Sequence, residues 1–195
     1  MKHKTGRILT DMCLLTILLG LGTLIFFLLY RSCHQPRMLS LAVTLLTFFY
    51  HLAMRLAVGE TVTILYRNKS FPQDRLGFRI YSFENGLYRK LKVKKWKTHV
   101  ISAKPEQFDL NLVSPEELLH NVMQAELVHR IIMALSFVPL LLIIPFGVPW
   151  VFIITSTTAC LSDSVFVMIQ RYNRPKVQHY LALAKKRETP KTSSN

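Results

Sequence analysis

The stretch Leu14–Tyr30 reads LLTILLGLGTLIFFLLY and contains no charged residue. An α-helix needs about 20 apolar residues to cross the hydrocarbon core of a bilayer. The apolar segment begins at Ile8, so a first membrane span is predicted over residues 8–30. Basic residues precede it, as in a secretory signal peptide, but its apolar run is longer than usual and no small-residue cleavage site follows. We therefore interpret it as a membrane anchor.

Three further apolar segments predict spans over residues 38–58, 127–144 and 150–169. A tight turn is expected at residues 145–149, because the prolines of Pro-Phe-Gly-Val-Pro do not continue a helix easily. The fold class is thus an all-α membrane protein with about four transmembrane helices. We expect a single membrane domain over residues 1–187, and a disordered Lys/Thr/Ser-rich tail over 188–195.

The distribution of charge predicts how the chain is oriented. The chain has 25 Lys and Arg against 11 Asp and Glu, a net charge of +14. Eleven of the basic residues fall in residues 66–123, seven follow Ile169 and three precede Ile8, but the turn at 145–149 has none. Basic loops stay in the cytoplasm, so a multi-pass cell-membrane protein with both termini cytoplasmic is expected. The same charge also suits anionic lipid headgroups or a phosphate-bearing substrate, whereas no nucleic-acid partner is expected.

The segment 66–123, between spans two and three, is predicted to be basic and partly interfacial. Its stretch Phe78–Lys97 reads FRIYSFENGLYRKLKVKKWK and mixes aromatic with basic side chains. Such a mixture suits the headgroup region, where rings lie flat and lysines reach phosphates. A basic loop with an aromatic anchor is the alternative. Asn85-Gly86 predicts a turn between two short elements, and Ser114-Pro-Glu-Glu predicts a helix start capped by Ser114.

Glu126 and His129 are three residues apart and share one face of the helix that leads into the third span. A carboxylate one turn from an imidazole can orient it as a general base for a hydroxyl. The alternative is a hydrogen-bonded pair with only a structural role.

Two polar features accompany the fourth span. Arg171, Asn173 and Arg174 offer forked donors for a carboxylate or phosphate, although a cap that ends the span is the simpler interpretation. Asp163 lies inside the span, where a carboxylate needs a partner, and His51 and Arg55 of the second span are candidates.

Three ordered blocks carry a resemblance to a known family: residues 82–97, Ala125–His129 (AELVH) and Gln170–Pro175 (QRYNRP). With them the chain resembles the glycosyl-4,4'-diaponeurosporenoate acyltransferase family over roughly residues 45–187. The named member of that family places a fatty acyl group on a glycosylated carotenoid. The family pattern commonly has Asn near Asp163, which implies a different acceptor if this side chain touches substrate.

The resemblance implies a membrane-bound O-acyltransferase that moves a fatty acyl group from a cytoplasmic thioester to a hydroxyl of a glycosylated lipid, such as a carotenoid glycoside. Acyl-CoA or an acylated carrier protein would be the co-substrate, with no bound cofactor and no metal. His129 and Glu126 are the predicted catalytic residues. The predicted substrate-binding residues are Arg171, Asn173, Arg174, Asp163, Trp96 and Lys95.

The residues also allow two other functions. A non-enzymatic membrane scaffold or lipid-binding subunit would use the polar residues only to lock helices together. A metal-dependent oxidoreductase would need paired histidines, but His99, His120, His129 and His179 show no such spacing. The three cysteines suggest neither a disulfide framework nor a zinc site.

Overall fold

The computed structural model describes residues 2–67, 69, 71, 78–97 and 105–188. By length and composition, four helical segments of this part are able to cross a membrane: Ile8–Cys33, Pro36–Tyr66, Pro115–Phe146 and Pro149–Arg187. No strand occurs among the described residues. The predicted all-α class and the predicted four spans are therefore confirmed. Most of the expected tail, residues 189–195, lies outside the described residues.

The chain divides into two compact units. Unit 1 consists of Met1–Ile64 and Val128–Val165, and unit 2 of Leu65–Leu127 and Phe166–Asn195. Two helices cross the boundary between the units. Helices α5 (Pro115–Leu135) and α7 (Pro149–Glu188) each contribute one part to each unit. Among the described residues, each unit brings charged side chains together around a buried carboxylate: Asp163 in unit 1 and Glu126 in unit 2.

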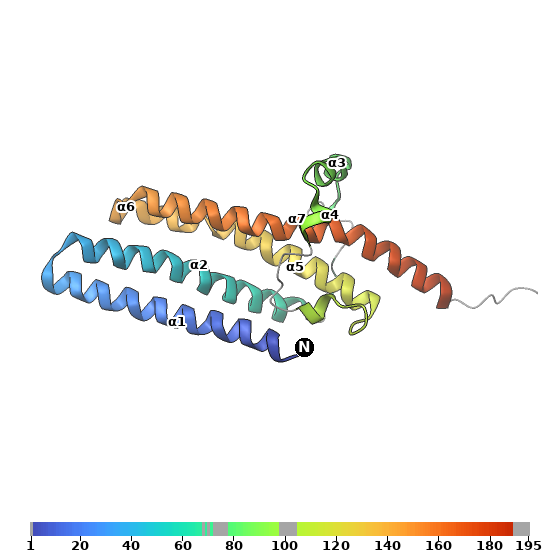
Figure 1. The fold of residues 1–195 in the computed structure, drawn as a ribbon, viewed down its shortest axis with the longest axis horizontal. Helices are drawn as coiled ribbons and strands as arrows, with labels where there is room; N and C mark the ends of the chain where they lie inside the picture. Colours follow the sequence, from blue (N-terminus) through green and yellow to red (C-terminus); the bar gives the residue numbers. More distant parts are fainter. Residues whose placement is uncertain (1, 68, 70, 72–77, 98–104, 189–195) are drawn as a thin grey trace, which may run out of the picture. The chain divides into compact units, whose positions relative to one another are not determined.

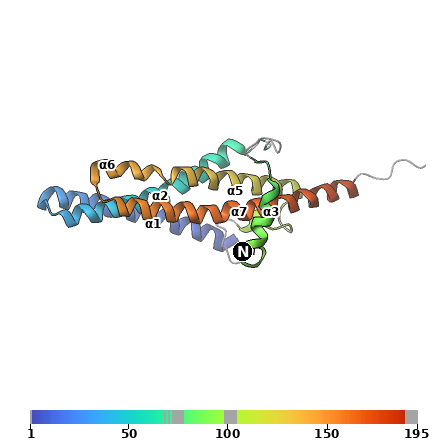
Figure 2. The same ribbon diagram turned by 90° about the horizontal axis from the view of Figure 1, so that it is seen from above.

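Unit 1 begins with a hairpin of α1 (Lys2–Cys33) and α2 (Pro36–Tyr66), which run in opposite directions (Figures 1 and 2). Two glycines of α1 let the helices approach closely. A Cβ atom on Gly20 would lie 3.1 Å from Phe49 Cε2, and one on Gly22 would lie 3.1 Å from Leu45 Cδ1. Small residues at such contacts allow close packing of membrane helices, where dispersion rather than the hydrophobic effect drives association.

The third span differs from the straight helix predicted over residues 127–144. Helix α5 ends at Leu135, and the chain continues as the 3₁₀ helix η4 (Val138–Leu142) and the short α6 (Ile143–Phe146). The cause is Pro139, which has no N–H to donate to the carbonyl of Leu135 and whose ring would clash with it. The Leu135 carbonyl instead accepts a hydrogen bond of 2.9 Å from the hydroxyl of Tyr50 on α2.

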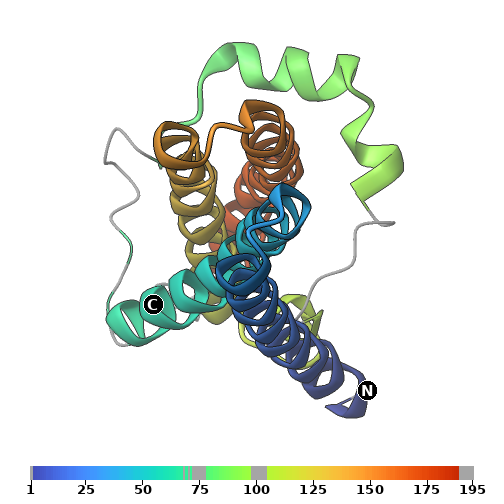
Figure 3. The same ribbon diagram turned by 90° about the vertical axis from the view of Figure 1, so that its left-hand side faces the viewer.

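The turn predicted at residues 145–149 is confirmed. Helix α6 ends at Phe146, Gly147 has a φ of 77°, and α7 begins at Pro149. A positive φ is open to glycine because it has no Cβ. This turn and the α1–α2 connection lie at the same end of unit 1, which faces the viewer in Figure 3.

Unit 2 contains α3 (Ser82–Lys90), α4 (Val93–Trp96), the 3₁₀ helix η3 (Pro105–Phe108), and the adjoining parts of α5 and α7. Its apolar core consists of Phe71, Leu119 and Met123, against which Tyr66, Phe78, Leu127, Val177 and Leu181 pack. The ring of Phe71 stacks on that of Tyr66 with 4.6 Å between centroids. This core fixes α5 against α7 and so positions the polar side chains beside it.

The predicted turn at Asn85-Gly86 is wrong, because both residues lie inside α3. The Glu84 side chain accepts a hydrogen bond of 2.9 Å from the backbone N–H of Tyr81, which caps the start of this helix. The chain leaves the helical conformation later, at Lys92, whose φ is 52°. The predicted cap at Ser114 is confirmed by a hydrogen bond of 3.2 Å from the backbone N–H of Glu117 to Ser114 Oγ.

Helix α7 is longer than the fourth span predicted over residues 150–169. Pro175 lies inside it, and the helix continues to Glu188. A proline would by itself be expected to end or kink a helix, but α7 continues past it. The side chains after Ile169 pack on the core of unit 2, and tertiary contacts of this kind outweigh the cost of one missing backbone hydrogen bond.

Candidate functional site

Unit 1 holds a chain of three polar side chains from three helices. Asp163 of α7 has only 2% of its side chain exposed. Its Oδ1 lies 2.8 Å from His129 Nδ1 on α5, and its Oδ2 accepts a hydrogen bond from Arg55 Nη2 on α2. The predicted partnership of Asp163 with Arg55 is confirmed. A carboxylate inside a span is thereby balanced by a guanidinium and bonded to an imidazole.

This arrangement orients His129. A carboxylate at Nδ1 accepts the ring N–H, which places the proton on Nδ1 and the basic lone pair on Nε2. About a fifth of the His129 side chain is exposed. A histidine oriented in this way is equipped to act as a general base at Nε2. That Glu126 orients the same ring stays a prediction.

His51, the second predicted partner of Asp163, contributes in a different way. Its backbone carbonyl accepts a hydrogen bond of 3.3 Å from Arg55 Nη1. His51 is 5% exposed, and neither of its ring nitrogens has a hydrogen-bond partner among the described residues. The ring instead packs edge-on against Tyr50, with 5.6 Å between centroids.

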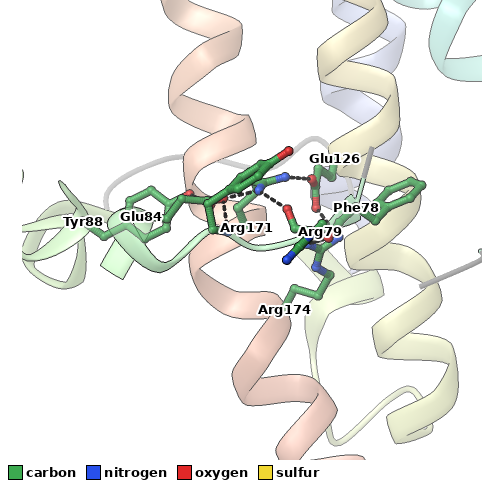
Figure 4. A network of polar contacts seen from close by, with 8 residues as sticks. Phe78, Arg79, Glu84, Tyr88, Glu126, Arg171 and Arg174 are labelled. Carbon is green, nitrogen blue, oxygen red and sulfur yellow. Dashed lines mark hydrogen bonds and ion pairs between the residues drawn. The ribbon is translucent and has the colours of Figure 1, made fainter. Parts of the chain in front are cut away.

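Unit 2 holds the second cluster, which is built around Arg171 of α7 (Figure 4). The Arg171 side chain donates from Nε to Glu84 Oε2 at 2.8 Å and from Nη1 to Glu126 Oε1 at 2.9 Å. Its Nη2 donates to the carbonyl of Arg79 at 2.8 Å and also to Glu84 Oε1. All three nitrogens of this guanidinium are therefore engaged within the protein.

Arg174 lies one turn further along α7 and is 1% exposed. Its Nη1 lies 3.1 Å from Glu126 Oε2, an ion pair without hydrogen-bond geometry, and its Nη2 donates to the carbonyl of Phe78. Its guanidinium also lies 5.6 Å from the centroid of the Phe78 ring. Both oxygens of the fully buried Glu126 thus face arginines. With Glu84, the cluster contains two positive and two negative side chains, which is the balance that buried charges require.

Glu84 was not among the predicted site residues, although it lies in a block that carries the family resemblance. Its Oε2 also accepts a hydrogen bond of 2.6 Å from the hydroxyl of Tyr88. Burial alone would raise the pKa of Glu84, but the hydrogen bonds from Arg171, the Tyr81 N–H and Tyr88 outweigh it and lower the pKa from 4.5 to about 2. Burial and Glu84 together raise the pKa of Tyr88 to about 12. The spacing of Glu84 and Tyr88, four residues apart on a helix, was the available sequence signal.

The remaining predicted substrate-binding residues lie at the end of α4 and beside it on α7. Asn173 Oδ1 accepts a hydrogen bond of 2.8 Å from Lys97 Nζ. Trp96 donates from its indole N–H to the carbonyl of Leu91 at 2.9 Å, and Lys95 is exposed. The structure therefore brings Glu126, Arg171 and Arg174 together in unit 2, and His129 and Asp163 together in unit 1. Within the described residues, no group of three or more His, Cys, Asp or Glu side chains is placed to hold a metal ion.

Comparison with known protein families matches residues 72–183 to the family described as glycosyl-4,4'-diaponeurosporenoate acyltransferase. No curated protein and no solved structure matches the chain. The matched range is 112 of the 195 residues and contains all three blocks that carry the resemblance. His129 and Asp163 lie within it, whereas Arg55 lies before it. The resemblance is confirmed, and the chain belongs to the glycosyl-4,4'-diaponeurosporenoate acyltransferase family.

Proposed function

We propose that this acyltransferase moves a fatty acyl group from a thioester donor to a hydroxyl of a glycosylated lipid within the cell membrane. Family membership supports the reaction class and names a carotenoid glycoside as the kind of acceptor. Four helices of membrane-spanning length support a lipid acceptor, because such a substrate stays in the bilayer. We place both termini and the basic segment in the cytoplasm, where acyl thioesters are available.

The observation that carries the mechanism is the contact of 2.8 Å between Asp163 Oδ1 and His129 Nδ1. In the proposed step, His129 Nε2 takes the proton of the acceptor hydroxyl while the hydroxyl oxygen attacks the thioester carbonyl carbon. The tetrahedral intermediate then expels the thiolate, which takes the proton from His129 and leaves as a thiol. Asp163 holds the ring in position and stabilises the imidazolium, and Arg55 balances the charge of Asp163 while the ring is neutral.

We assign the cluster in unit 2 a positioning role. Arg171 donates from all three nitrogens to protein groups, and both Glu126 oxygens face arginines. These contacts join α3, α5 and α7 through their side chains. Glu126, Arg171 and Arg174 would thus keep α5 and α7 in register without touching the reacting atoms.

Single substitutions at His129 and Asp163 test this mechanism. Cells carrying the wild-type chain, His129→Ala, Asp163→Asn or the control His179→Ala are compared by lipid mass spectrometry at equal membrane levels. His179 is an exposed histidine on the same α7 helix. A general base contributes about 10²- to 10⁴-fold, so His129→Ala should reduce the acylated lipid to near background. Asp163→Asn should retain partial activity, because an amide oxygen still accepts the Nδ1 proton.

Two outcomes would contradict the proposal. Retained turnover with His129→Ala would remove His129 as the base. Absence of any lipid that gains an acyl mass with the wild-type chain would contradict the acceptor class and favour a lipid-binding role.

A further inference from the structure

Unit 2 contains a second polar feature, distinct from the buried cluster, on the α4 side of helix α7. Lys176 Nζ lies 3.4 Å from the centroid of the Tyr172 ring, and Lys97 Nζ lies 5.2 Å from the same centroid. The two ammonium groups are therefore at most 8.6 Å apart, the sum of these two distances. Lys94 is close enough to act electrostatically on both Lys97 and Tyr172. We call Lys94, Lys97, Tyr172 and Lys176 the lysine–tyrosine cluster.

The positions of Lys97 and Lys176 are set by polar contacts. Lys97 Nζ donates to Asn173 Oδ1 at 2.8 Å, and Lys176 interacts with the side chain of Tyr172 one turn before it on α7. The Tyr172 ring also packs edge-on against Tyr88 of α3, with 6.0 Å between centroids. The ring is thus fixed by α3, and its faces hold the cations by cation–π contact.

The charged side chains of this cluster are all positive. The stretch from Arg89 to Lys97 has six basic residues in nine and no acidic one. Burial, Lys176 and Lys94 lower the pKa of Lys97. Three like charges held together repel one another by an amount that an anion would relieve.

We propose that the lysine–tyrosine cluster binds the phosphate groups of the acyl donor, a thioester of the coenzyme A type. This inference rests on the proposed function, because it names the donor of that reaction. A donor of this type carries three phosphate groups and about four negative charges near pH 7, which suits three lysines held as point charges. The phosphodiester of an anionic lipid headgroup offers the same chemistry with about one charge, so the charge of the cluster favours the donor.

Binding of coenzyme A to the full chain in nanodiscs of neutral lipid tests the proposal by calorimetry. The variants are Lys97→Gln, Lys176→Gln and their combination, with Lys186→Gln as the control at an exposed lysine near the end of α7. Loss of one charge-assisted contact is expected to weaken binding about 10-fold, and loss of both about 100-fold. Pantetheine, which has no phosphate, should bind equally to all four variants. Lys97→Arg, which retains the charge, should keep most of the affinity and shows that the site still folds.

The outcomes distinguish binding of the donor from binding of a lipid, and they test donor binding separately from the catalytic mechanism. Equal affinity of the wild-type chain and the double variant for coenzyme A would overturn the proposal. The proposal would also be overturned if the lysine substitutions changed only the retention of anionic lipid, measured in nanodiscs that contain such lipid. In turnover assays the lysine variants should raise KM for the donor and leave kcat unchanged, whereas His129→Ala should lower kcat. If His129→Ala retained kcat while the lysine variants still raised KM for the donor, the proposed mechanism would be contradicted. The proposal on donor binding would be unaffected.

Discussion

Replacing Glu84 with glutamine should destabilise unit 2 by about 3 kcal/mol at pH 7. The pKa of Glu84 falls from 4.5 to about 2 in the folded chain, and each pKa unit corresponds to about 1.36 kcal/mol. The product is about 3 kcal/mol, and it agrees with the roughly 3–5 kcal/mol lost when a buried ion pair loses one partner. Glutamine keeps the shape of the side chain but removes the charge that faces Arg171.

The effect has a defined dependence on pH. A carboxyl with a lowered folded pKa contributes stability that is present above its unfolded pKa and is lost as the pH falls through the folded value. The window is therefore pH 4.5 to about 2. The difference between the wild-type chain and Glu84→Gln should shrink from about 3 kcal/mol at pH 7 to about 1.4 kcal/mol at pH 3, where Glu84 is protonated in the unfolded chain but still mostly ionised in the folded chain.

The assay is equilibrium unfolding of the purified full chain in detergent, followed by fluorescence. The chain has two tryptophans, so a Trp150→Phe background leaves Trp96 of α4 as the single reporter in unit 2. Glu116→Gln is the matched control, because Glu116 forms an ion pair of 3.7 Å with Lys185 in which both side chains are more than half exposed. Exposed pairs contribute about 0–1 kcal/mol. The reasoning is refuted if Glu84→Gln costs no more than Glu116→Gln, or if its cost is the same at pH 3 and pH 7.

Two further substitutions test local features. Ser114→Ala should lower the free energy of unfolding by about 1 kcal/mol, because the first turn of α5 loses the acceptor for the Glu117 N–H. Thermal denaturation measures this loss, and an unchanged midpoint would show that the cap contributes nothing. His51→Leu should leave the stability unchanged or raise it by about 1 kcal/mol, because it removes a buried ring without hydrogen-bond partners among the described residues. A loss of 2 kcal/mol or more in the same denaturation experiment would instead indicate that a bound group satisfies this ring.

Local patterns predicted well those features that depend on neighbours in the sequence. Hydropathy located the four spans because the bilayer selects helices by length and apolar content. Ser114 was identified as a cap because its partner is three residues away. Arg55 was identified as a partner for Asp163 because a charge inside a span requires a countercharge, and few were available.

The failures share a cause in tertiary contacts. Asn85-Gly86 favours a turn by itself, but Glu84 caps α3 and is held by Arg171, 87 residues away. Pro175 disfavours a helix, yet packing on the core of unit 2 carries α7 past it. Pro139 lies within an apolar run and ends α5, because it has no N–H for the carbonyl of Leu135. Tyr50, which lies 85 residues before Leu135, donates to that carbonyl instead.

By itself the sequence determined the class of the protein, its membrane spans, its family and the residue types available for chemistry. Hydropathy, charge and short ordered motifs carry this information, since each can be recognised within a stretch of sequence no longer than one span. Only the tertiary structure decided which charges meet: Asp163 with His129 and Arg55, and Glu126 with Arg171 and Arg174. Such pairings join residues 34 to 108 positions apart, and they depend on the rotation and register of packed helices. Those are set by the complete set of side chains at the helix contacts, which no local pattern contains.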